Sequence, residues 1–250
     1  MKIAISQPTY LPWVGYFDLI DQVDLFVLLD NVQFEKRSWQ QRNRIKTADG
    51  LQWLTIPVLS RGKREQRIVD VELAEPGFWR NHLRTIDLNY HRAPFFETYF
   101  NSLSECVERE ADFGSLSRLT IGIIEWLKDA LGIMTATIRA SNLGAEGKRS
   151  ELLANICAGL GATEYLSPFG SADYLLEDLP VMASKGIEVA FHHYEHPVYR
   201  QLNPPFQAYA CALDVLFNEG GNALEIIRRG RRAAFSPKEA ALQAGATVAS

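Results

Sequence analysis

A run of six residues, LFVLLD at positions 25–30, is apolar at every position but the last. A strand with two apolar faces is typical of a parallel sheet that helices cover on both sides. Residues 3–6 form a similar short apolar run that comes first in the chain, and residues 135–141 return to strand character. Between the first two runs, residues 15–23 carry apolar side chains three and four positions apart, which indicates a helix. This alternation predicts β-α-β units, and hence an α/β fold.

The 250 residues are enough for one large domain with a well-buried core. Residues 78–132 contain three stretches with helical spacing and interrupt the alternation of strand and helix. We therefore predict a doubly wound, mostly parallel sheet, Rossmann-like or HUP-like, with a helical insertion, in a single domain of residues 1–235. Residues 236–250 are rich in Ala, Ser and Gly, which predicts a disordered tail.

The composition narrows the classes of function. There are 26 Lys and Arg residues against 30 Asp and Glu residues, a formal net charge of −4, so we do not expect a nucleic-acid partner. No stretch is apolar for long enough to predict a membrane span, and the start of the chain does not resemble a signal peptide. The three cysteines lack zinc-site spacing and favour a cytoplasmic protein with free thiols. The oligomeric state stays open.

The first candidate site is the stretch SQPTYLPWVGY, directly after the first strand. Doubly wound sheets bind ligands at the carboxyl ends of their strands. Two prolines stiffen this turn, a glycine allows close backbone approach, and the helix that follows offers free N–H groups to a phosphate. The alternative is that the aromatic rings only pack. We predict that this turn binds a cofactor or substrate through Gln7, Thr9, Tyr10, Gly15 and Tyr16.

The second candidate site is DNVQFEKRSWQQRNRI, which starts at the end of a probable central strand. Asp30 stands where α/β enzymes place a catalytic or ribose-binding acid, and we predict a catalytic role for it. Arginine and lysine side chains suit phosphate or carboxylate, so Lys36, Arg42 and Asn43 are the predicted anion-binding residues. The alternative is a solvated charged loop.

Two further turns follow later strands. SNLGAEGKRSELL places glycines before Lys148, Arg149 and the N-cap residue Ser150, which favours phosphate binding without the spacing of a Walker A motif. The alternative is an ordinary capped helix. YLSPFGSADYL places Ser167 in a turn of small residues, and we predict that it binds substrate, because the nucleophile-elbow pattern is missing.

The stretch HHYEHP brings three histidines and a glutamate together within five residues. Neighbouring residues of a strand point to opposite faces, so all four cannot meet one ion, and we predict no metal site. His193 and His196 are instead predicted to act as general bases or hydrogen-bonding groups.

Several longer stretches resemble a known family: ISQPTYLPWVGYFDLI, DLFVLLDNVQFEKRSWQQRNRI, WLTIPV, EYLSPFGSADYL, and YEHPVYRQ with FQAYACALDVLFNEG. Together, over about residues 3–221, the chain resembles the WbqC-like protein family. Members are associated with bacterial surface-polysaccharide (O-antigen) gene clusters and are often described as transferases. One departure is Ser167-Pro168, where a glycine-containing turn is expected.

A more distant resemblance links the first turn, and the strand that ends near Asp30, to the HIGH-type nucleotidyltransferases. Their His-x-x-His pair is absent, because the corresponding stretch, residues 9–16, reads TYLPWVGY. If the chemistry of that superfamily persists, the resemblance implies that ATP and Mg²⁺ are cofactors.

The resemblances imply a transferase of surface-polysaccharide biosynthesis with a nucleotide-linked sugar or another small molecule as substrate. It would transfer an acyl or aminoacyl group, such as glycyl, to an amino-sugar nucleotide through an ATP-derived adenylate. Asp30, His193 or His196 would then take the proton from the attacking amine. Two alternatives stay open: a glycosyltransferase, and a non-catalytic scaffold protein that binds a nucleotide sugar.

Overall fold

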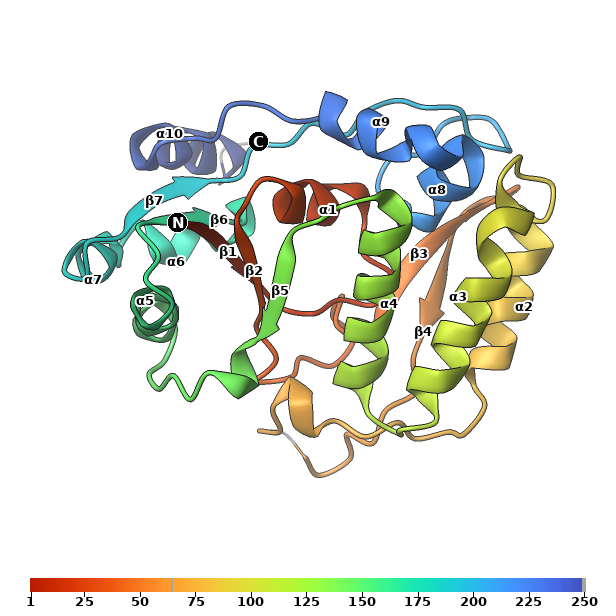
Figure 1. The fold of residues 1–250 in the computed structure, drawn as a ribbon, viewed down its shortest axis with the longest axis horizontal. Helices are drawn as coiled ribbons and strands as arrows, with labels where there is room; N and C mark the ends of the chain where they lie inside the picture. Colours follow the sequence, from red (N-terminus) through yellow and green to blue (C-terminus); the bar gives the residue numbers. More distant parts are fainter. Residues whose placement is uncertain (64, 249–250) are drawn as a thin grey trace.

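The computed structural model describes residues 1–63 and 65–248 (Figure 1). Its main sheet has five strands, all parallel, in the order β5-β2-β1-β6-β7. These strands are β1 (Lys2–Ser6), β2 (Leu25–Leu28), β5 (Ala136–Arg139), β6 (Glu164–Ser167) and β7 (Glu188–Phe191). The predicted α/β class and the parallel sheet are confirmed.

The strand order reverses beside β1. From β1 the chain crosses to β2 on one side and later reaches the edge strand β5, and from there it returns to β6 on the other side of β1. Ligands of open α/β sheets bind outside the carboxyl ends of the strands at such a reversal. The topology therefore directs attention to the residues that follow β1 and β6.

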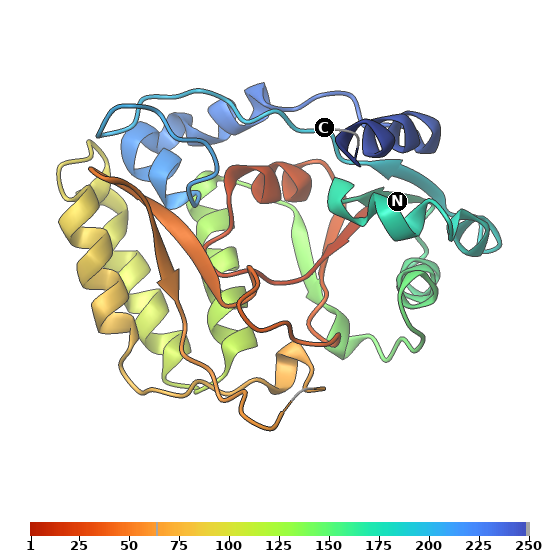
Figure 2. The ribbon, with the colours of Figure 1, turned by 180° about the vertical axis from the view of Figure 1, so that it is seen from behind.

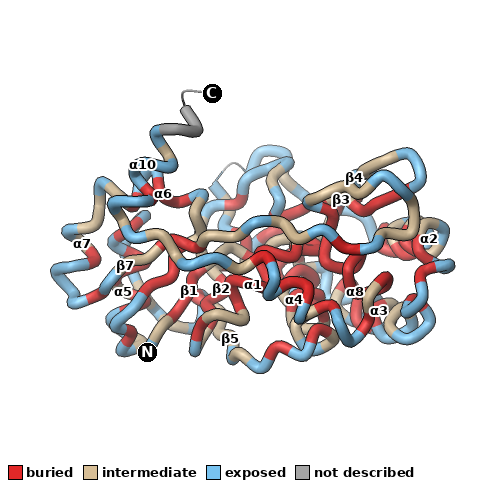
Figure 3. The backbone as a smooth tube through the Cα atoms, turned by 90° about the horizontal axis from the view of Figure 1, so that it is seen from above, coloured by how far each residue is buried: buried red, intermediate tan, exposed pale blue. Residues whose placement is uncertain are grey.

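Each face of the sheet has its own hydrophobic core. Along β1, Ile3 and Ile5 point into one cluster and Ala4 points into the other, because side chains alternate between the faces of a strand. All three residues are at most 2% exposed, and full burial of one isoleucine contributes about 1.5–3 kcal/mol. Figure 3 shows the buried backbone of β1, β2 and α1 at the centre of the molecule.

Ten α-helices surround the two sheets of the described chain. They are α1 (Val14–Asp21), α2 (Trp79–Tyr90), α3 (Phe96–Ala111), α4 (Leu116–Leu131), α5 (Ser150–Gly159), α6 (Ala172–Leu175), α7 (Leu179–Ala183), α8 (Leu213–Glu219), α9 (Ala223–Arg229) and α10 (Pro237–Val248). Helices α2, α3 and α4 occupy the region predicted as a helical insertion and lie beyond the β5 edge of the sheet (Figure 1). No helix among the described residues is long and apolar enough to cross a membrane.

A separate antiparallel hairpin joins β3 (Arg42–Thr47) to β4 (Gly50–Thr55) and lies beside α2 (Figure 2). The stretch QWLTIPV at residues 52–58 predicts a strand near β4, whereas the charged stretch before it predicts a loop where β3 begins. The first four residues of β3 alternate: Asn43 and Ile45 are buried, whereas Arg42 and Arg44 on the opposite face are partly exposed. Two arginines in one short strand hide this alternation from a search for apolar runs.

The chain after α9 differs from the predicted tail. Residues 237–248 form α10, which contacts α6 and β7, while residues 249–250 lie outside the described part. At its start, the backbone N–H and hydroxyl of Ser236 donate to the Glu239 carboxylate, and the N–H of Glu239 lies 3.3 Å from the Ser236 hydroxyl. This is a capping box, and Ala240 behind it is fully buried. The Ser-x-x-Glu spacing is a signal of this helix that the composition of residues 236–250 does not give.

Candidate functional site

A cavity of about 800 Å³ lies at the carboxyl ends of β1, β6 and β7. Ser6 ends β1, and residues 168–170 and 192–195 directly follow β6 and β7. Hairpin residues Asn43 and Arg44 form another part of the wall. Cavities of this size suit a drug-sized or nucleotide-sized ligand. The cavity therefore lies beside the strand-order reversal, where the topology predicts a ligand.

The β1–α1 turn forms one wall, and it is held in an unusual conformation. Leu11 has φ +45°, a left-handed conformation that costs a non-glycine residue free energy. Its carbonyl accepts a hydrogen bond of 2.8 Å from the Asn43 amide, and the N–H of Tyr10 donates to the Trp39 carbonyl at 2.9 Å. The hairpin and the loop before it thus hold this turn in place.

Aromatic rings cover much of the cavity wall. Trp13 contacts Tyr194 and Tyr209, each with 5.5 Å between ring centroids. A Cβ atom on Gly15 would lie 2.3 Å from the Trp13 ring, so only glycine leaves room for the ring there. Such flat apolar surfaces suit the rings of a sugar or a nucleobase.

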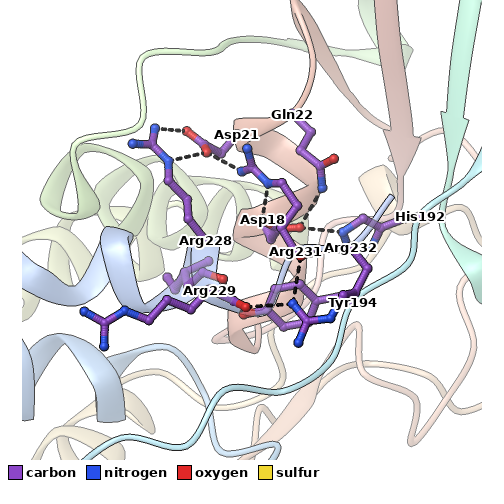
Figure 4. A network of polar contacts seen from close by, with 10 residues as sticks. Asp18, Asp21, Gln22, His192, Tyr194, Arg228, Arg229, Arg231 and Arg232 are labelled. Atoms are coloured by element: carbon purple, nitrogen blue, oxygen red, sulfur yellow. Dashed lines mark hydrogen bonds and ion pairs between the residues drawn. The ribbon is translucent and has the colours of Figure 1, made fainter. Parts of the chain in front are cut away.

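His192 lines the cavity, and its imidazole pairs with a buried carboxylate (Figure 4). Its Nε2 atom lies 2.8 Å from Oδ2 of Asp18 in α1, and Asp18 is fully buried. Asp18 also accepts hydrogen bonds from Gln22 at 2.6 Å and from Arg231 at 2.9 Å. An ionised carboxylate can only accept a hydrogen bond, so Nε2 is the donor to Asp18, and Nδ1 of the neutral imidazole is the proton acceptor. No hydrogen bond joins Nδ1 to another residue in the described part of the chain.

A second carboxylate, that of Asp21, belongs to the same network of ion pairs as Asp18. Asp21 pairs with Arg228 at 2.7 Å and also with Arg231. Burial by itself would raise the pKa of Asp21, but the hydrogen bonds and charges of the two arginines outweigh burial and hold that pKa below its ordinary value. Two carboxylates and two guanidiniums thus hold α1 against the end of α9 and the segment after it, and fix Asp18 against His192 (Figure 4).

The comparison with known proteins is consistent with the resemblance seen in the sequence. A profile of the WbqC-like protein family matches residues 7–226, a range that contains both Asp18 and His192. The chain belongs to the WbqC-like protein family. The uncharacterized protein Rv1507c of Mycobacterium tuberculosis is 35% identical over 232 residues, which are 92% of this chain and 99% of that protein. No solved structure matched the chain.

Three of the predicted residues of the first turn line the cavity of this WbqC-like protein, namely Thr9, Gly15 and Tyr16. Two others hold the turn from behind. The Gln7 side-chain oxygen accepts a hydrogen bond of 2.7 Å from Gln40. Tyr10 is 2% exposed, and its hydroxyl lies 2.8 Å from Nδ1 of His82.

In the second predicted segment, residues 30–45, some residues line the cavity and others lie outside it. Asn43 lines the cavity, but its amide already bonds the Leu11 carbonyl and the Arg44 N–H. Asp30 is fully buried and lies outside the cavity wall, where it accepts hydrogen bonds from Arg139 at 2.8 Å and from the N–H and hydroxyl of Ser141 at 2.9 Å. Asp30 thus ties the end of β2 to the end of β5. A catalytic role for Asp30 stays a prediction.

The basic residues predicted to hold phosphate are spread over the surface. Lys36 is exposed, and Arg42 lies over the Trp53 ring at 4.4 Å. Lys148 and Arg149 are exposed before α5. None of these four lines the cavity, whereas their unpredicted neighbour Arg44 does.

The two predicted serines are buried and hydrogen-bonded. The Ser150 hydroxyl donates to Asp178 at 2.7 Å, and the hydroxyls of Ser167 and Ser171 lie 2.6 Å apart. The Ser167 carbonyl accepts a hydrogen bond of 2.8 Å from the backbone N–H of His192. Ser167 therefore positions His192 through its backbone.

The histidines of HHYEHP occupy three different environments. His193 lines the cavity and stacks on Phe235 at 4.0 Å. His196 packs between Trp13 and Tyr209, and burial lowers its pKa. The sequence predictions for catalysis omit His192 and Asp18. One signal is present: Asp18 stands among apolar residues on both sides, Tyr16-Phe17 and Leu19-Ile20, in a helix whose residues 14–20 are all buried.

Proposed function

We propose that this WbqC-like protein is a transferase that moves an acyl or aminoacyl group onto the amine of a nucleotide-linked amino sugar. The observation that carries the proposal is the His192–Asp18 pair in the wall of a cavity beside the strand-order reversal. An imidazole that is oriented by a carboxylate is a common proton acceptor near neutral pH. The setting, synthesis of bacterial surface polysaccharide, rests on the family resemblance.

In the proposed step, the amine nitrogen of the sugar attacks the acyl carbon of an activated carboxyl group. A C–N bond forms, and the bond between the acyl carbon and the leaving oxygen breaks. The proton of the amine passes to Nδ1 of His192, and the Asp18 carboxylate stabilises the imidazolium that results.

Activation of the acyl group with ATP and Mg²⁺ is part of the proposal. The rings of Trp13, Tyr194 and Tyr209 in the cavity wall suit an adenine ring. Within residues 1–63 and 65–248, no three His, Cys, Asp or Glu side chains gather to ligate a metal. Mg²⁺ would therefore be held mainly through the phosphates that it accompanies.

Mass spectrometry of a reaction with ATP, Mg²⁺, glycine and an amino-sugar nucleotide tests the proposal. We expect an amide product from the wild type and at least about 100-fold slower turnover from His192→Gln, with binding retained. His91→Gln, at an exposed histidine at the end of α2, is the matched control and should turn over at the wild-type rate.

Three other outcomes would contradict the proposal. A product with a new glycosidic bond would identify a glycosyltransferase. Binding without turnover, across a panel of acyl donors and amino sugars, would identify a binding or scaffold protein. Full activity of His192→Gln together with loss of activity in Asp30→Asn would move the proton acceptor to Asp30.

A further inference from the structure

An exposed group of tryptophans and arginines stands at the rim of the cavity. Trp39 and Trp53 are 48% and 42% exposed, and their ring centroids are 5.3 Å apart. The Arg42 guanidinium lies over Trp53 at 4.4 Å, and that of Arg44 lies 5.5 Å from Trp39 and 5.4 Å from Trp53. We name these four residues the Trp–Arg platform.

The hairpin builds this platform through its register. Arg44 and Trp53 are directly opposed across β3 and β4, so their side chains emerge on the same face. Arg42, two residues from Arg44, shares that face, while Asn43 and Leu54 on the other face are buried. The platform is continuous with the cavity, because Trp39 and Arg44 both line it.

Arg44 carries an unbalanced charge in the cavity wall. No carboxylate or other hydrogen-bond acceptor within the described residues pairs with its guanidinium, and its Nε atom is buried without a partner. Glu195 is the acidic residue among the lining residues, and it is already paired with Arg232 at 2.6 Å. A guanidinium without a carboxylate partner in a cavity wall favours an anion, and phosphate oxygens suit it well.

We propose that the Trp–Arg platform is the subsite for the nucleoside diphosphate part of the substrate. The base stacks on Trp39 and Trp53, and the diphosphate accepts hydrogen bonds from Arg44. This inference rests on the proposed function, since it assigns a place to the nucleotide that carries the amino sugar.

The exposed fractions of these residues indicate how the ligand is oriented in the cavity. The tryptophans at the rim are nearly half exposed, Arg44 is partly buried, and His192 is 8% exposed. A nucleotide sugar has the same order of parts: a base, then a charged diphosphate, then the sugar. With the base at the rim, the amino sugar extends into the cavity toward His192, which accepts its proton.

If the platform only stabilised the fold, substitutions in it would lower stability without weakening nucleotide binding. Guanidinium–ring contacts stabilise proteins modestly wherever they occur. Arg118 lies over the exposed Phe113 at 3.3 Å, and neither residue belongs to this cavity. That pair is therefore a matched control for contact type and exposure.

Isothermal titration calorimetry with ADP, GDP, CDP, UDP and inorganic pyrophosphate tests the inference. We expect the wild type to bind at least one nucleoside diphosphate more tightly than pyrophosphate. Trp53→Ala should weaken that binding by about tenfold or more, and Trp53→Phe should restore most of it. Arg44→Gln should weaken nucleoside diphosphate and pyrophosphate alike, whereas Phe113→Ala and Arg118→Gln should bind as the wild type does.

Several results would overturn the inference: no nucleoside diphosphate binds the folded wild type, pyrophosphate binds as tightly as every nucleoside diphosphate, or Trp53→Ala binds normally. Circular dichroism establishes that each variant is folded. If the platform variants bind normally while His192→Gln loses transfer, the inference fails and the proposed function stands. If the platform binds a nucleoside diphosphate but no transfer occurs, the inference stands and the proposed function fails.

Discussion

Replacement of Asp18 by alanine tests whether the buried network of Figure 4 holds the site together. The change leaves three donors without their carboxylate, those of His192, Gln22 and Arg231. Arg231 is 31% exposed and keeps Asp21 as a partner, so the substitution removes little of the stabilisation that Arg231 provides. His192 is 8% exposed and has no replacement for Asp18 among the described residues.

The magnitude follows from these exposures. A buried donor that loses its partner costs about 1–3 kcal/mol. His192 is buried and Gln22 is only partly buried, so together they give at most roughly 3 kcal/mol. In a protein of this size, that loss lowers the melting temperature by roughly 6–12 °C. The conservative variant Asp18→Asn keeps the shape of the side chain and one acceptor oxygen, so its loss should be smaller.

Urea unfolding followed by circular dichroism measures both variants. Glu225→Ala is the control, because the Glu225–Arg229 pair is exposed on both sides and its removal should change stability by less than about 1 kcal/mol. A change as small as that control in Asp18→Ala would refute the reasoning, since it would mean that Asp18 does not hold His192 in the folded protein.

Three further predictions concern the surroundings of the site. Gly15→Ala should displace the Trp13 ring, destabilise the protein by about 1–3 kcal/mol and weaken ligand binding, whereas Gly159→Ala, which meets no atom within 4 Å, should do neither in the same assays. Burial lowers the pKa of His82 to about 4. Between pH 6.5 and pH 4 the unfolded chain therefore binds more protons at His82 than the folded protein does, so the free energy of unfolding should fall by about 2–3 kcal/mol or less as the pH drops through this range. In a pH series of urea titrations, His82→Phe should flatten this part of the curve. Burial raises the pKa of the Cys211 thiol to about 12, so a thiol reagent should label it only after denaturant is added; rapid labelling of the native protein would contradict its burial.

The sheet could be predicted because its signal is local. The run at residues 25–30 is apolar on both faces, and such a run has few stable places other than the middle of a covered sheet. The hairpin was harder to predict, since Arg42 and Arg44 lie on its exposed face and read as part of a charged loop. Helix α10 could not be predicted from composition, because the Ala, Ser and Gly content of residues 236–250 does not show the Ser236–Glu239 capping box that starts the helix.

The candidate site depends on information that no short stretch contains. Thr9, Gly15 and Tyr16 could be selected because they follow a strand, and they do line the cavity. Asp18 and His192 are 174 positions apart, and they meet because β6 and β7 lie on the far side of β1 from β2. Sequence spacing within HHYEHP does not show which histidine faces a carboxylate on another element.

The most direct measurement is a crystal structure of the protein with a nucleotide-linked amino sugar bound. We predict that the sugar amine lies within hydrogen-bond distance, about 3 Å, of Nδ1 of His192. We also expect the base to lie against Trp39 and Trp53, with the diphosphate beside Arg44. A ligand bound outside the cavity, or one whose amine points away from His192, would contradict the account.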